Sequence, residues 1–579
     1  MSKISGSQII IEALKCEGVD TVFGYPGGAV IPLFDALYST PEINVVLTRH
    51  EQGAVHAADG YARSTGKVGA VIVTSGPGAT NTVTGLATAN FDSVPIVCIT
   101  GQVPTSMMGI DAFQEADVTG ITNAVTKHNY LVSRIEDLAE TIKNSFHIAG
   151  TGRPGPVVID IPKDVLLGSY KFNYDGKINI RGYKPHIEGH PNQLKKVVQM
   201  LANAKKPVVI VGGGAIISDS SPEINEFIKI CDVPVTATLN GLGCVEYDNP
   251  YFLGMHGMHG TIAANSAIQE CDLLIALGSR FDDRATGKLS TFAPNAEIVH
   301  IDIDSASISK NVNVDVPVVG DLKVVMKQIL PMLSAVKRPE WMARIAELKK
   351  KSHQMTRGKD RVTSIEVFDI LNKTLEEDTI IATDVGQHQM WTALYYKFKK
   401  PRTLLTSGGL GTMGFGFPAA VGAQLANMDK QVVCISGDGS FQMNIQELAT
   451  AVINELPIII LIMNNGYLGM VRQWQELFND ERYSSTCLMK CRKDPSKCRG
   501  VEEECFKFIP DFVKVAEAYG AVGIRVKKTE ELESAIKKAL ELKDKPVLID
   551  ILTDRKENVW PMVPAGASLD DMMKGGMTL

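Results

Sequence analysis

Two oxygen-bearing side chains, Asp438 and Asn465, each follow an apolar run of the sequence. Val432 to Ser436 enters the turn Gly437-Asp438-Gly439, and after a helix-length segment the run Ile458 to Met463 ends at Asn464-Asn465. This pattern predicts a parallel strand, helix, strand unit, whose right-handed crossover places both strand ends at one edge of a sheet. A carboxylate and an amide oxygen beside a glycine turn suit Mg²⁺ that itself holds phosphate groups. An ordinary strand-to-helix turn without a ligand is the alternative.

A second candidate group is the carboxylate of Glu51, at the start of a predicted helix. Arg49-His50-Glu51 follows the apolar run Ile43 to Thr48 and precedes a helical segment from Gln52 to Arg63. This order places Glu51 at the edge of a sheet in the first part of the chain. A glutamate in the first turn of a helix can also serve only to complement the helix dipole.

The segments that must position these groups repeat one pattern. Val71 to Ser75 enters Gly76-Pro77-Gly78, a helical segment follows, and Pro95 precedes the apolar run Ile96 to Thr100. The same order of strand, glycine turn, helix, proline and strand surrounds Asp438, which indicates that the chain contains one α/β unit twice. The first copy lacks the aspartate and the asparagine pair, so we expect it to have the fold without the metal site.

A third α/β segment lies between the two copies. Pro207 to Val211 enters Gly212-Gly213-Gly214, Asp272 to Leu277 ends at Gly278, and Ile298 to Ile303 contains Asp302 near its end. Strands that end in glycine or in an acidic residue are typical of doubly wound sheets that bind dinucleotides. No full GxGxxG motif is present, so a purely structural sheet remains open.

The length of 579 residues predicts three to four domains. We expect an α/β fold with three doubly wound parallel-sheet domains. The predicted segments are an N-terminal domain over 1–170, a central domain over 190–335, a linker over 336–364, a third domain over 365–552 with a cysteine-rich insertion over 487–505, and a C-terminal tail over 553–579. The tail has too little apolar periodicity for a domain, and it either folds over a site as a lid or is disordered.

Composition excludes several classes of partner. Hydrophobic residues make up 45% and charged residues 21%, as in ordinary globular proteins. A net charge of -6 and a pI near 6.1 argue against a nucleic acid or an anionic membrane as the main partner. No apolar run approaches the ~18 residues that span a bilayer. The N-terminus lacks a secretory signal, so a cytoplasmic location is expected.

The ten cysteines fall into two groups. Six are scattered in or beside apolar segments and are expected to be small buried hydrophobic residues: Cys16, Cys98, Cys231, Cys244, Cys271 and Cys434. Four crowd into the predicted insertion: Cys487, Cys491, Cys498 and Cys505. These four thiols could hold Zn²⁺ or an iron–sulfur cluster, but the spacing has no CxxC pair, and disulfides or free thiols remain open.

The glycine–aspartate turn and the asparagine pair resemble the signature of enzymes that depend on thiamine diphosphate, and RHEQGAVHAADGYAR (49–63) resembles their pyrimidine-binding segment. Within that superfamily, longer stretches resemble the acetohydroxyacid synthase (acetolactate synthase) family of large catalytic subunits. They are FGYPGGAVIPLFDAL (23–37), DAFQEADV (111–118), TGRPGPVVIDIPKDV (151–165), GMHGMHGT (254–261), SRFDDRATGK (279–288) and GYLGMVRQWQELF (466–478). The cysteine-rich insertion departs from the family, whose members usually run on directly there.

The resemblance implies an activity and its cofactors. Pyruvate would be decarboxylated on thiamine diphosphate, and the hydroxyethyl unit would be transferred to a second pyruvate or to 2-ketobutyrate, giving 2-acetolactate or 2-aceto-2-hydroxybutyrate for valine, leucine and isoleucine biosynthesis. Mg²⁺ would hold the diphosphate, and FAD would bind in the central domain in a non-redox role. The cofactor would bridge two chains of a homodimer or homotetramer, with a possible regulatory small subunit. A catabolic acetolactate synthase or a pyruvate oxidase-like enzyme is the near alternative, and a flavin or nicotinamide oxidoreductase or a non-catalytic paralogue the distant one.

The resemblance also assigns residues by their match to the family's motifs. For catalysis and substrate they are Glu51 as the activating acid, Gly28, Ala29, Phe113, Gln114, Lys163, Met258, Asp283, Arg284 and Trp474. For thiamine diphosphate they are Tyr25, Pro26, Gly76, Asn81, Gly386, Gln387, His388, Gly411, Met413, Gly437, Asp438, Gly439, Ser440 and Met470, with Asp438, Asn465 and the carbonyl of Tyr467 on Mg²⁺. For FAD they are Arg153, Gly212, Gly213, Gly214, His259, Gly260, Thr261, Gly278, Arg280, Arg284, Asp302, Ile303 and Asp321. From the residues alone, Met413 could equally be core filler and Trp474 a surface indole packed on its own helix.

Overall fold

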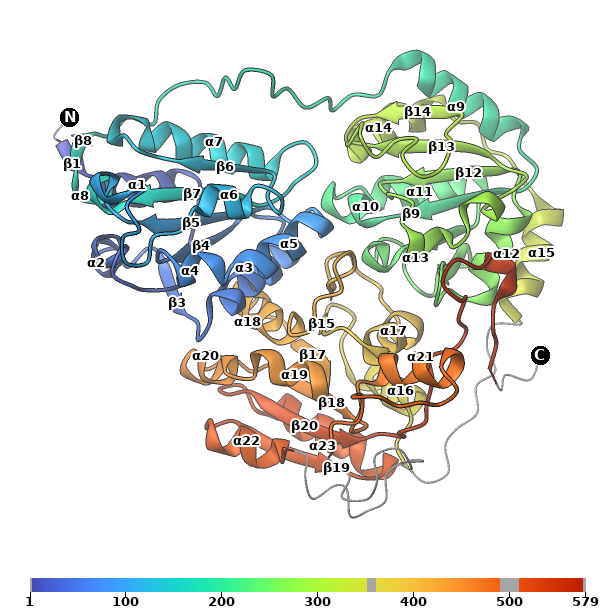
Figure 1. The fold of residues 1–579 in the computed structure, drawn as a ribbon. Helices are drawn as coiled ribbons and strands as arrows, with labels where there is room; N and C mark the ends of the chain where they lie inside the picture. Colours follow the sequence, from blue (N-terminus) through green and yellow to red (C-terminus); the bar gives the residue numbers. More distant parts are fainter. Residues whose placement is uncertain (1–2, 351–360, 490–509, 576–579) are drawn as a thin grey trace.

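The computed structural model describes residues 3–350, 361–489 and 510–575. Within these residues the chain forms three six-stranded parallel sheets, and a two-stranded antiparallel pair of β1 (Lys3–Ser5) with β8 (Ser169–Lys171). The sheets define an N-terminal, a central and a third domain, which surround a common centre in Figure 1. The predicted fold class is confirmed. The six-stranded sheets fall inside the predicted segments, whose boundaries stay a prediction.

The N-terminal domain is a parallel sheet covered by helices on both faces. Along β4, Ile72 packs with α1, α2 and α7, whereas Val71 packs with α3 and α5, because successive side chains of a strand point to opposite faces. The strand order is β3-β2-β4-β5-β7-β6. The strands are β2 (Thr21–Tyr25), β3 (Asn44–Leu47), β4 (Gly69–Val73), β5 (Ile96–Gln102), β6 (His128–Leu131) and β7 (Val157–Pro162). The helices are α1 (Gly6–Cys16), α2 (Ile31–Tyr38), α3 (Glu51–Thr65), α4 (Pro77–Thr80), α5 (Val83–Asp92), α6 (Val118–Thr122), α7 (Leu138–Gly150) and α8 (Lys163–Leu167).

The central domain has the strand order β11-β10-β9-β12-β13-β14. This order reverses direction between β9 and β12, and such a switch point is where doubly wound sheets bind their ligands. The strands are β9 (Pro207–Val211), β10 (Val235–Ala237), β11 (Phe252–Met255), β12 (Leu273–Leu277), β13 (Glu297–Asp302) and β14 (Val316–Val319). The helices are α9 (Pro191–Asn203), α10 (Gly213–Ile217), α11 (Ser221–Cys231), α12 (Ile262–Glu270), α13 (Asp283–Thr286), α14 (Leu322–Ile329) and α15 (Pro339–Lys350).

The third domain repeats the topology of the first. Its order, β16-β15-β17-β18-β20-β19, matches that of the N-terminal sheet strand for strand, which confirms the predicted internal repeat. The strands are β15 (Ile380–Thr383), β16 (Leu404–Leu405), β17 (Val432–Gly437), β18 (Ile459–Asn464), β19 (Val522–Val526) and β20 (Val547–Leu552). The helices are α16 (Ser364–Thr374), α17 (Gln387–Tyr395), α18 (Gly416–Ala426), α19 (Asp438–Phe441), α20 (Glu447–Ile453), α21 (Gly469–Phe478), α22 (Phe512–Ala518) and α23 (Thr529–Glu541).

The linker helix and the tail are packed against the domains. In α15, Trp341 is buried and its indole N–H donates to the carbonyl of Pro207 at 3.0 Å, so this helix belongs to the central domain's core. In the tail, Met562 and Val563 are buried, and the N–H of Val563 donates to the carbonyl of Met258 at 2.8 Å. The alternative that the tail is disordered is therefore wrong for residues 553–575.

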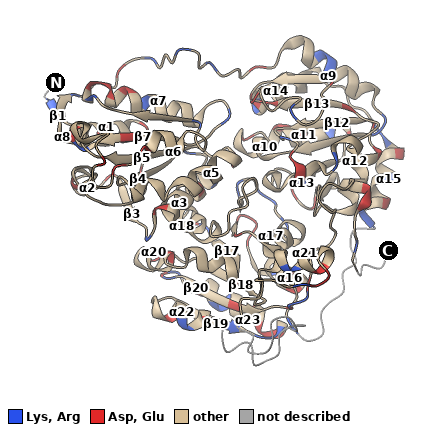
Figure 2. Ribbon diagram, in the orientation of Figure 1, with Lys and Arg blue, Asp and Glu red and all other residues tan. Residues whose placement is uncertain are grey.

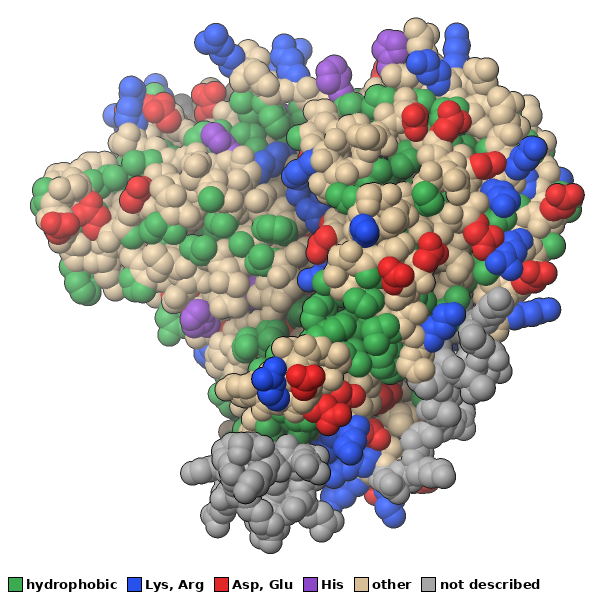
Figure 3. All heavy atoms as spheres, turned by 45° about the vertical axis from the view of Figure 1, so that its right-hand side comes forward, with side chains coloured by type: hydrophobic (Ala, Val, Ile, Leu, Met, Phe, Trp, Pro, Cys, Tyr) green, Lys and Arg blue, Asp and Glu red, His purple; other side chains and the backbone are tan. Residues whose placement is uncertain are grey.

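In the view of Figure 2, residues of both charges occur in all three domains. In the view of Figure 3, hydrophobic side chains gather where the central and third domains adjoin, and both charges are scattered over the rest of the face. Among the described residues we find no helix with the length and apolarity that a membrane span needs. The cytoplasmic location stays a prediction.

The structure corrects the predicted burial of one cysteine, and it does not decide the role of the four clustered cysteines. Cys16 is exposed at the end of α1, because the helix turns it away from the core, whereas Cys98, Cys231, Cys244, Cys271 and Cys434 are buried as expected. Of the four clustered cysteines, Cys491, Cys498 and Cys505 lie outside the described residues. No group of three or more His, Cys, Asp or Glu side chains with metal-binding geometry occurs among the residues that are described.

Candidate active site

The carboxyl ends of the strands in the third domain bring one set of predicted residues together. Gly386 to His388 follow β15, Met413 follows β16, Gly437 ends β17 with Asp438 to Ser440 directly after it, and Asn465 follows β18. They surround a small cavity of about 60 Å³. Its predicted lining residues are Gly386, Gln387, His388, Met413, Gly437, Asp438, Gly439, Ser440, Asn465, Tyr467 and Met470.

The oxygens at this edge fit a divalent cation. Asp438 is 1% exposed, and its Oδ2 has no hydrogen-bond partner among the described residues. Burial raises the pKa of this carboxyl to about 7, because the buried carboxylate form is disfavoured on its own. A bound cation would stabilise that carboxylate. Asn465 lines the same cavity, and its amide oxygen accepts from the N–H of Tyr467 at 2.9 Å. In a typical site for Mg²⁺ bound to a diphosphate, the protein ligands are one carboxylate together with amide or carbonyl oxygens.

Backbone glycines and a neutral imidazole complete the cradle. A Cβ placed at Gly437 would lie 3.0 Å from His388 Nδ1, and one at Gly439 would lie 2.8 Å from the Leu468 side chain. Burial lowers the pKa of His388 to about 3, so the ring is neutral at physiological pH. Its Nε2 has no partner among the described side chains, which leaves it available to a ligand.

The N-terminal domain carries the other predicted group at the equivalent edge of its sheet. Glu51 is the first residue of α3, and its Oε2 accepts from the side-chain amide of Asn81 at 3.0 Å. Tyr25, Pro26 and Gly28 follow β2 and are exposed. The remaining members at this edge are Ala29, which is buried, Gly76, Phe113, Gln114 and Lys163.

These N-terminal residues do not reach the small cavity within one chain. Among the residues that line this small cavity there is neither Glu51 nor any of the residues that share its edge. Phe113 is 88% exposed although it is aromatic, and Gln114 has a positive φ of 62°. Large exposed hydrophobic side chains near a functional edge indicate a surface that another molecule covers.

A much larger cavity, of about 1240 Å³, lies where the three domains meet. It contains most of the residues predicted for FAD and for the second substrate: Arg153, Gly213, Gly214, Met258, His259, Gly278, Arg280, Asp283, Arg284, Asp302, Ile303, Asp321 and Trp474. Gly386, Gly411, Met413 and Met470 line it as well, so the two cavities share a wall. Its lining residues come from all three domains, which suits an extended dinucleotide.

Close backbone contacts explain the glycines of the switch point. A Cβ at Gly212 would lie 2.1 Å from the carbonyl oxygen of Gly278, which itself has a φ of 60°. Gly212 therefore serves the contact between the two strand ends and does not line the cavity. Gly260 and Thr261 are also absent from the lining: Thr261 caps α12 by accepting from the N–H of Ala264 at 3.1 Å. Gly260 and Thr261 directly follow His259, which does line the cavity.

Three arginines give the large cavity its positive groups. Arg153 and Arg280 come from different domains, and both donate to backbone carbonyls near the end of α5, those of Asn90 and Phe91. Arg284 is 60% exposed at its side chain and is held only loosely, with Asp283 at 3.7 Å. Its Nη1 also donates to the sulfur of Met258 at 3.4 Å, and an exposed guanidinium in the lining of a cavity suits a carboxylate of a bound ligand.

Comparison with known proteins agrees with this arrangement. The chain matches the N-terminal thiamine pyrophosphate binding domain over residues 4–121, the central domain of thiamine pyrophosphate enzymes over 194–329, and the C-terminal thiamine pyrophosphate binding domain over 384–551. It is 46% identical to the acetolactate synthase large subunit of Haemophilus influenzae, over 99% of this chain and 98% of that protein. The corresponding large subunit of Corynebacterium glutamicum is 48% identical over 98% of this chain and 90% of its own length. The isozyme 3 large subunit of Escherichia coli is 45% identical over 99% of both chains.

The chain belongs to the acetolactate synthase large-subunit family. Membership confirms the predicted family, the enzyme class and the dependence on thiamine diphosphate, which is the thiamine pyrophosphate of the matched domains. The catabolic and oxidase-like alternatives are not favoured.

In this acetolactate synthase family member, Trp474 lies on the wall of the large cavity, and its assignment to the substrate stays a prediction. It is half-buried on α21 and lines the large cavity, while its ring packs edge-on against Phe478 at 5.4 Å between centroids. The alternative of an indole packed on its own helix is therefore also partly correct. Met470, one turn earlier, lines both cavities.

Sequence reasoning missed the residues that hold the acetolactate synthase site in place. Gln473 is fully buried: its Oε1 accepts from the N–H of Val559, and its Nε2 donates to the Val559 carbonyl. Gln387 Nε2 donates to the same Oε1 at 3.0 Å, so the tail is tied directly to the small cavity. Gln473 stands inside the quoted stretch GYLGMVRQWQELF, but no spacing rule marks it, because its partners lie far away in the sequence.

Proposed function

We propose that the chain decarboxylates pyruvate and transfers the two-carbon unit to a second pyruvate or to 2-ketobutyrate, as the catalytic subunit of an acetolactate synthase. The products are 2-acetolactate and 2-aceto-2-hydroxybutyrate. The observation that carries the proposal is the pair of equivalent sheet edges, one with Glu51 and the other with Asp438 and Asn465, in a chain of this family.

The residues at the small cavity hold and orient the cofactor. Asp438, Asn465 and the Tyr467 carbonyl bind Mg²⁺, and Gly437 and Gly439 let the backbone approach the diphosphate. Thiamine diphosphate, when bound, supplies the electron sink for decarboxylation of a 2-ketoacid. Met413 and the neutral ring of His388 line the same cavity, and Met413 would support the bound cofactor there.

The complete site requires two chains. Glu51 would hold the proton that activates the aminopyrimidine ring when the cofactor is bound, and Asn81 orients its carboxylate. Because Glu51 lines neither cavity of its own chain, a second copy brings its Glu51 to the Asp438 of the first. Exposed Tyr25, Phe113 and Ile110 on the same edge are then covered by that copy. We therefore propose a homodimer as the smallest active unit, with a homotetramer and a regulatory small subunit as further assemblies.

The large cavity holds FAD and the acceptor. Its switch-point glycines and Arg153, Arg280 and Asp321 suit a dinucleotide with a diphosphate. Arg284 binds the carboxylate of the acceptor 2-ketoacid, and Trp474 with Met470 forms a broad apolar wall that favours 2-ketobutyrate over pyruvate. The net charge of -6 argues against a nucleic acid or an anionic membrane as partner.

An assay of acetolactate, converted to acetoin by acid, tests the proposal. With pyruvate the protein should form product only when thiamine diphosphate and Mg²⁺ are present, and Glu51→Gln should lose most of the turnover. Adding 2-ketobutyrate should divert the product to 2-aceto-2-hydroxybutyrate, and the flavin spectrum should not bleach during turnover. Turnover that is indifferent to the cofactor, or product that is acetate with bleached flavin, would refute the proposal.

A further inference from the structure

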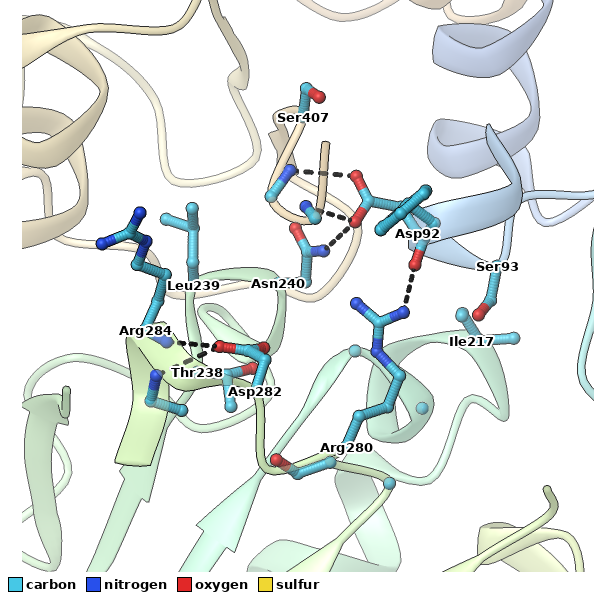
Figure 4. A pocket seen from close by; sticks show the side chains of 18 of the residues that line it. Asp92, Ser93, Ile217, Thr238, Leu239, Asn240, Arg280, Asp282, Arg284 and Ser407 are labelled. Carbon is cyan, nitrogen blue, oxygen red and sulfur yellow. Dashed lines mark hydrogen bonds between the residues drawn. The ribbon is translucent and has the colours of Figure 1, made fainter. Parts of the chain in front are cut away.

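Asp92, the last residue of α5, carries a fully buried carboxylate at the point where the three domains meet (Figure 4). Its Oδ1 accepts from the side-chain amide of Asn240 at 3.1 Å and from the N–H of Gly409 at 2.8 Å. Its Oδ2 accepts from Arg63 Nη2 and from the N–H of Gly408, both at 2.9 Å. One carboxylate therefore bonds to all three domains at once.

The two glycines belong to the loop 406–413, which connects β16 with α18 and carries Met413. Met413 lines both cavities, so the position of this loop sets the shape of their shared wall. A Cβ at Gly408 would lie 2.7 Å from Asn240 Nδ2, and one at Gly409 would lie 3.0 Å from the carboxylate. The loop has no side chains where it meets the buried acid, because the backbone must approach closely enough to donate its N–H groups.

The end of α5 is also held by residues of the large cavity. Arg280, from the central domain, donates to the carbonyl of Phe91 at 2.6 Å, and Arg153 donates to the carbonyl of Asn90 at 3.2 Å. Asn240 lies in the turn after β10, and all three of these side chains line the cavity. In Figure 4, Asn240 and Arg280 approach Asp92 from the central domain while the Ser407 loop approaches from the third. A ligand that orders Asn240 and Arg280 also orders the surroundings of Asp92.

We propose that Asp92 is a positioning residue that couples occupancy of the large cavity by a flavin dinucleotide to the placement of the Met413 loop, and so to binding of thiamine diphosphate. The inference rests on the proposed function, because it concerns the two cofactors assigned there. Ordering the junction with the first ligand removes part of the ordering that the second ligand would otherwise impose. Such coupling acts equally in both directions.

The hydrogen-bond pattern makes Asp92→Asn a sharp test. All four bonds to the carboxylate come from donors, so an asparagine must turn its own NH₂ group toward two of them in either orientation. Asn240→Ala removes only the bond from the central domain. Asp59→Asn is the matched control: Asp59 is the other carboxylate of Arg63 on α3, with Nε at 2.5 Å, and it makes no bond to the loop.

The experiment measures the affinity for thiamine diphosphate, with Mg²⁺, in apoprotein with and without saturating FAD. Quenching of flavin fluorescence gives the FAD affinity, and the shift of the thermal midpoint reports the binding of thiamine diphosphate. In the wild type and in Asp59→Asn, FAD should tighten thiamine diphosphate binding by about fivefold or more. In Asp92→Asn and Asn240→Ala this factor should fall toward one, and FAD affinity should lose the same dependence on thiamine diphosphate.

Two results would overturn the proposal. One is an Asp92→Asn protein in which FAD tightens thiamine diphosphate binding as much as in the wild type. The other is a wild type in which FAD leaves the affinity for thiamine diphosphate unaltered. If Asp92→Asn does not fold, Asn240→Ala decides in the same way. Acetolactate formation by the wild type is scored separately, so a protein that shows the coupling without this activity would refute the proposed function and leave the role of Asp92 standing.

Discussion

Helices α3 and α18 cross at a glycine seam that fixes Glu51 relative to the third domain, and Gly422→Ala tests it. A Cβ at Gly422 would lie 1.8 Å from the carbonyl oxygen of Ala57, and a Cβ at Gly60 would lie 2.0 Å from that of Ala419. Real Cβ contacts are essentially never shorter than 3.0 Å, so the backbones must separate by at least 3.0 − 1.8 = 1.2 Å. Because α3 begins at Glu51, this displacement moves the predicted catalytic acid.

Gly422→Ala has two opposing effects on the free energy of unfolding, and the sign of the net change tests the close contact of the two helices. Alanine normally stabilises a helix interior by about 0.5–1 kcal/mol over glycine, whereas overpacking costs about 1–3 kcal/mol. We expect overpacking to win at Gly422, with a net loss of about 2 kcal/mol and a turnover lowered by roughly tenfold to a hundredfold, as ångström displacements of catalytic groups produce.

Thermal midpoints by circular dichroism and kcat at saturating cofactor measure the two effects. Gly150→Ala is the control, because its Cβ would make only an ordinary contact at 3.5 Å with Val68, and it should be neutral or slightly stabilising. A Gly422→Ala protein that is as stable and as active as the wild type would refute the close approach of the two helices.

Three further predictions concern buried polar groups. Burial raises the pKa of Asp160 from its ordinary 3.8 to about 7, so ionisation of this carboxyl opposes folding. As pH rises from about 4 to 7, the wild type should lose stability relative to Asp160→Asn by at most about 4 kcal/mol, as measured by thermal melts across that range. Gln473→Leu strands the N–H and carbonyl of Val559 and removes one of the two acceptors of Gln387 Nε2, which keeps its bond to the Glu557 carbonyl. It should lower the unfolding free energy by about 2–4 kcal/mol and expose the tail to limited proteolysis; an unaltered tail would contradict this. Asp438→Asn should keep its fold but lose the stabilisation by Mg²⁺ and thiamine diphosphate, which at a hundredfold excess over Kd is about 2.7 kcal/mol in the wild type and should vanish with EDTA.

The strand ends made the candidate site predictable from sequence. Asp438 and Asn465 close a parallel strand, helix, strand unit, and such units place both strand ends at one edge whatever surrounds them. The repeat of the unit followed from matching glycine turns, because the same backbone turn needs the same residue type. Assigning chemistry to Glu51 needed the family resemblance, since its local pattern is equally that of a helix start.

The remaining features depend on contacts between distant segments. Asp92 is a polar residue at the end of an ordinary helix, and only the folded chain brings Gly408 and Asn240 to it. The packing of the tail likewise comes from partners such as Met258, which no periodicity within the tail reveals. Thr261 matched a family motif but serves as a helix cap, because motifs include the residues that build a wall as well as those that touch a ligand.

Hybrid dimers test most directly whether each active site is shared between two chains. Glu51→Gln and Asp438→Ala are each expected to be inactive alone. In a hybrid of the two, prepared with different affinity tags, one site combines the intact Glu51 of one chain with the intact Asp438 of the other. The account predicts about half of the wild-type turnover per hybrid dimer. A hybrid as inactive as its parents would show that the two groups must come from the same chain, and it would contradict the account.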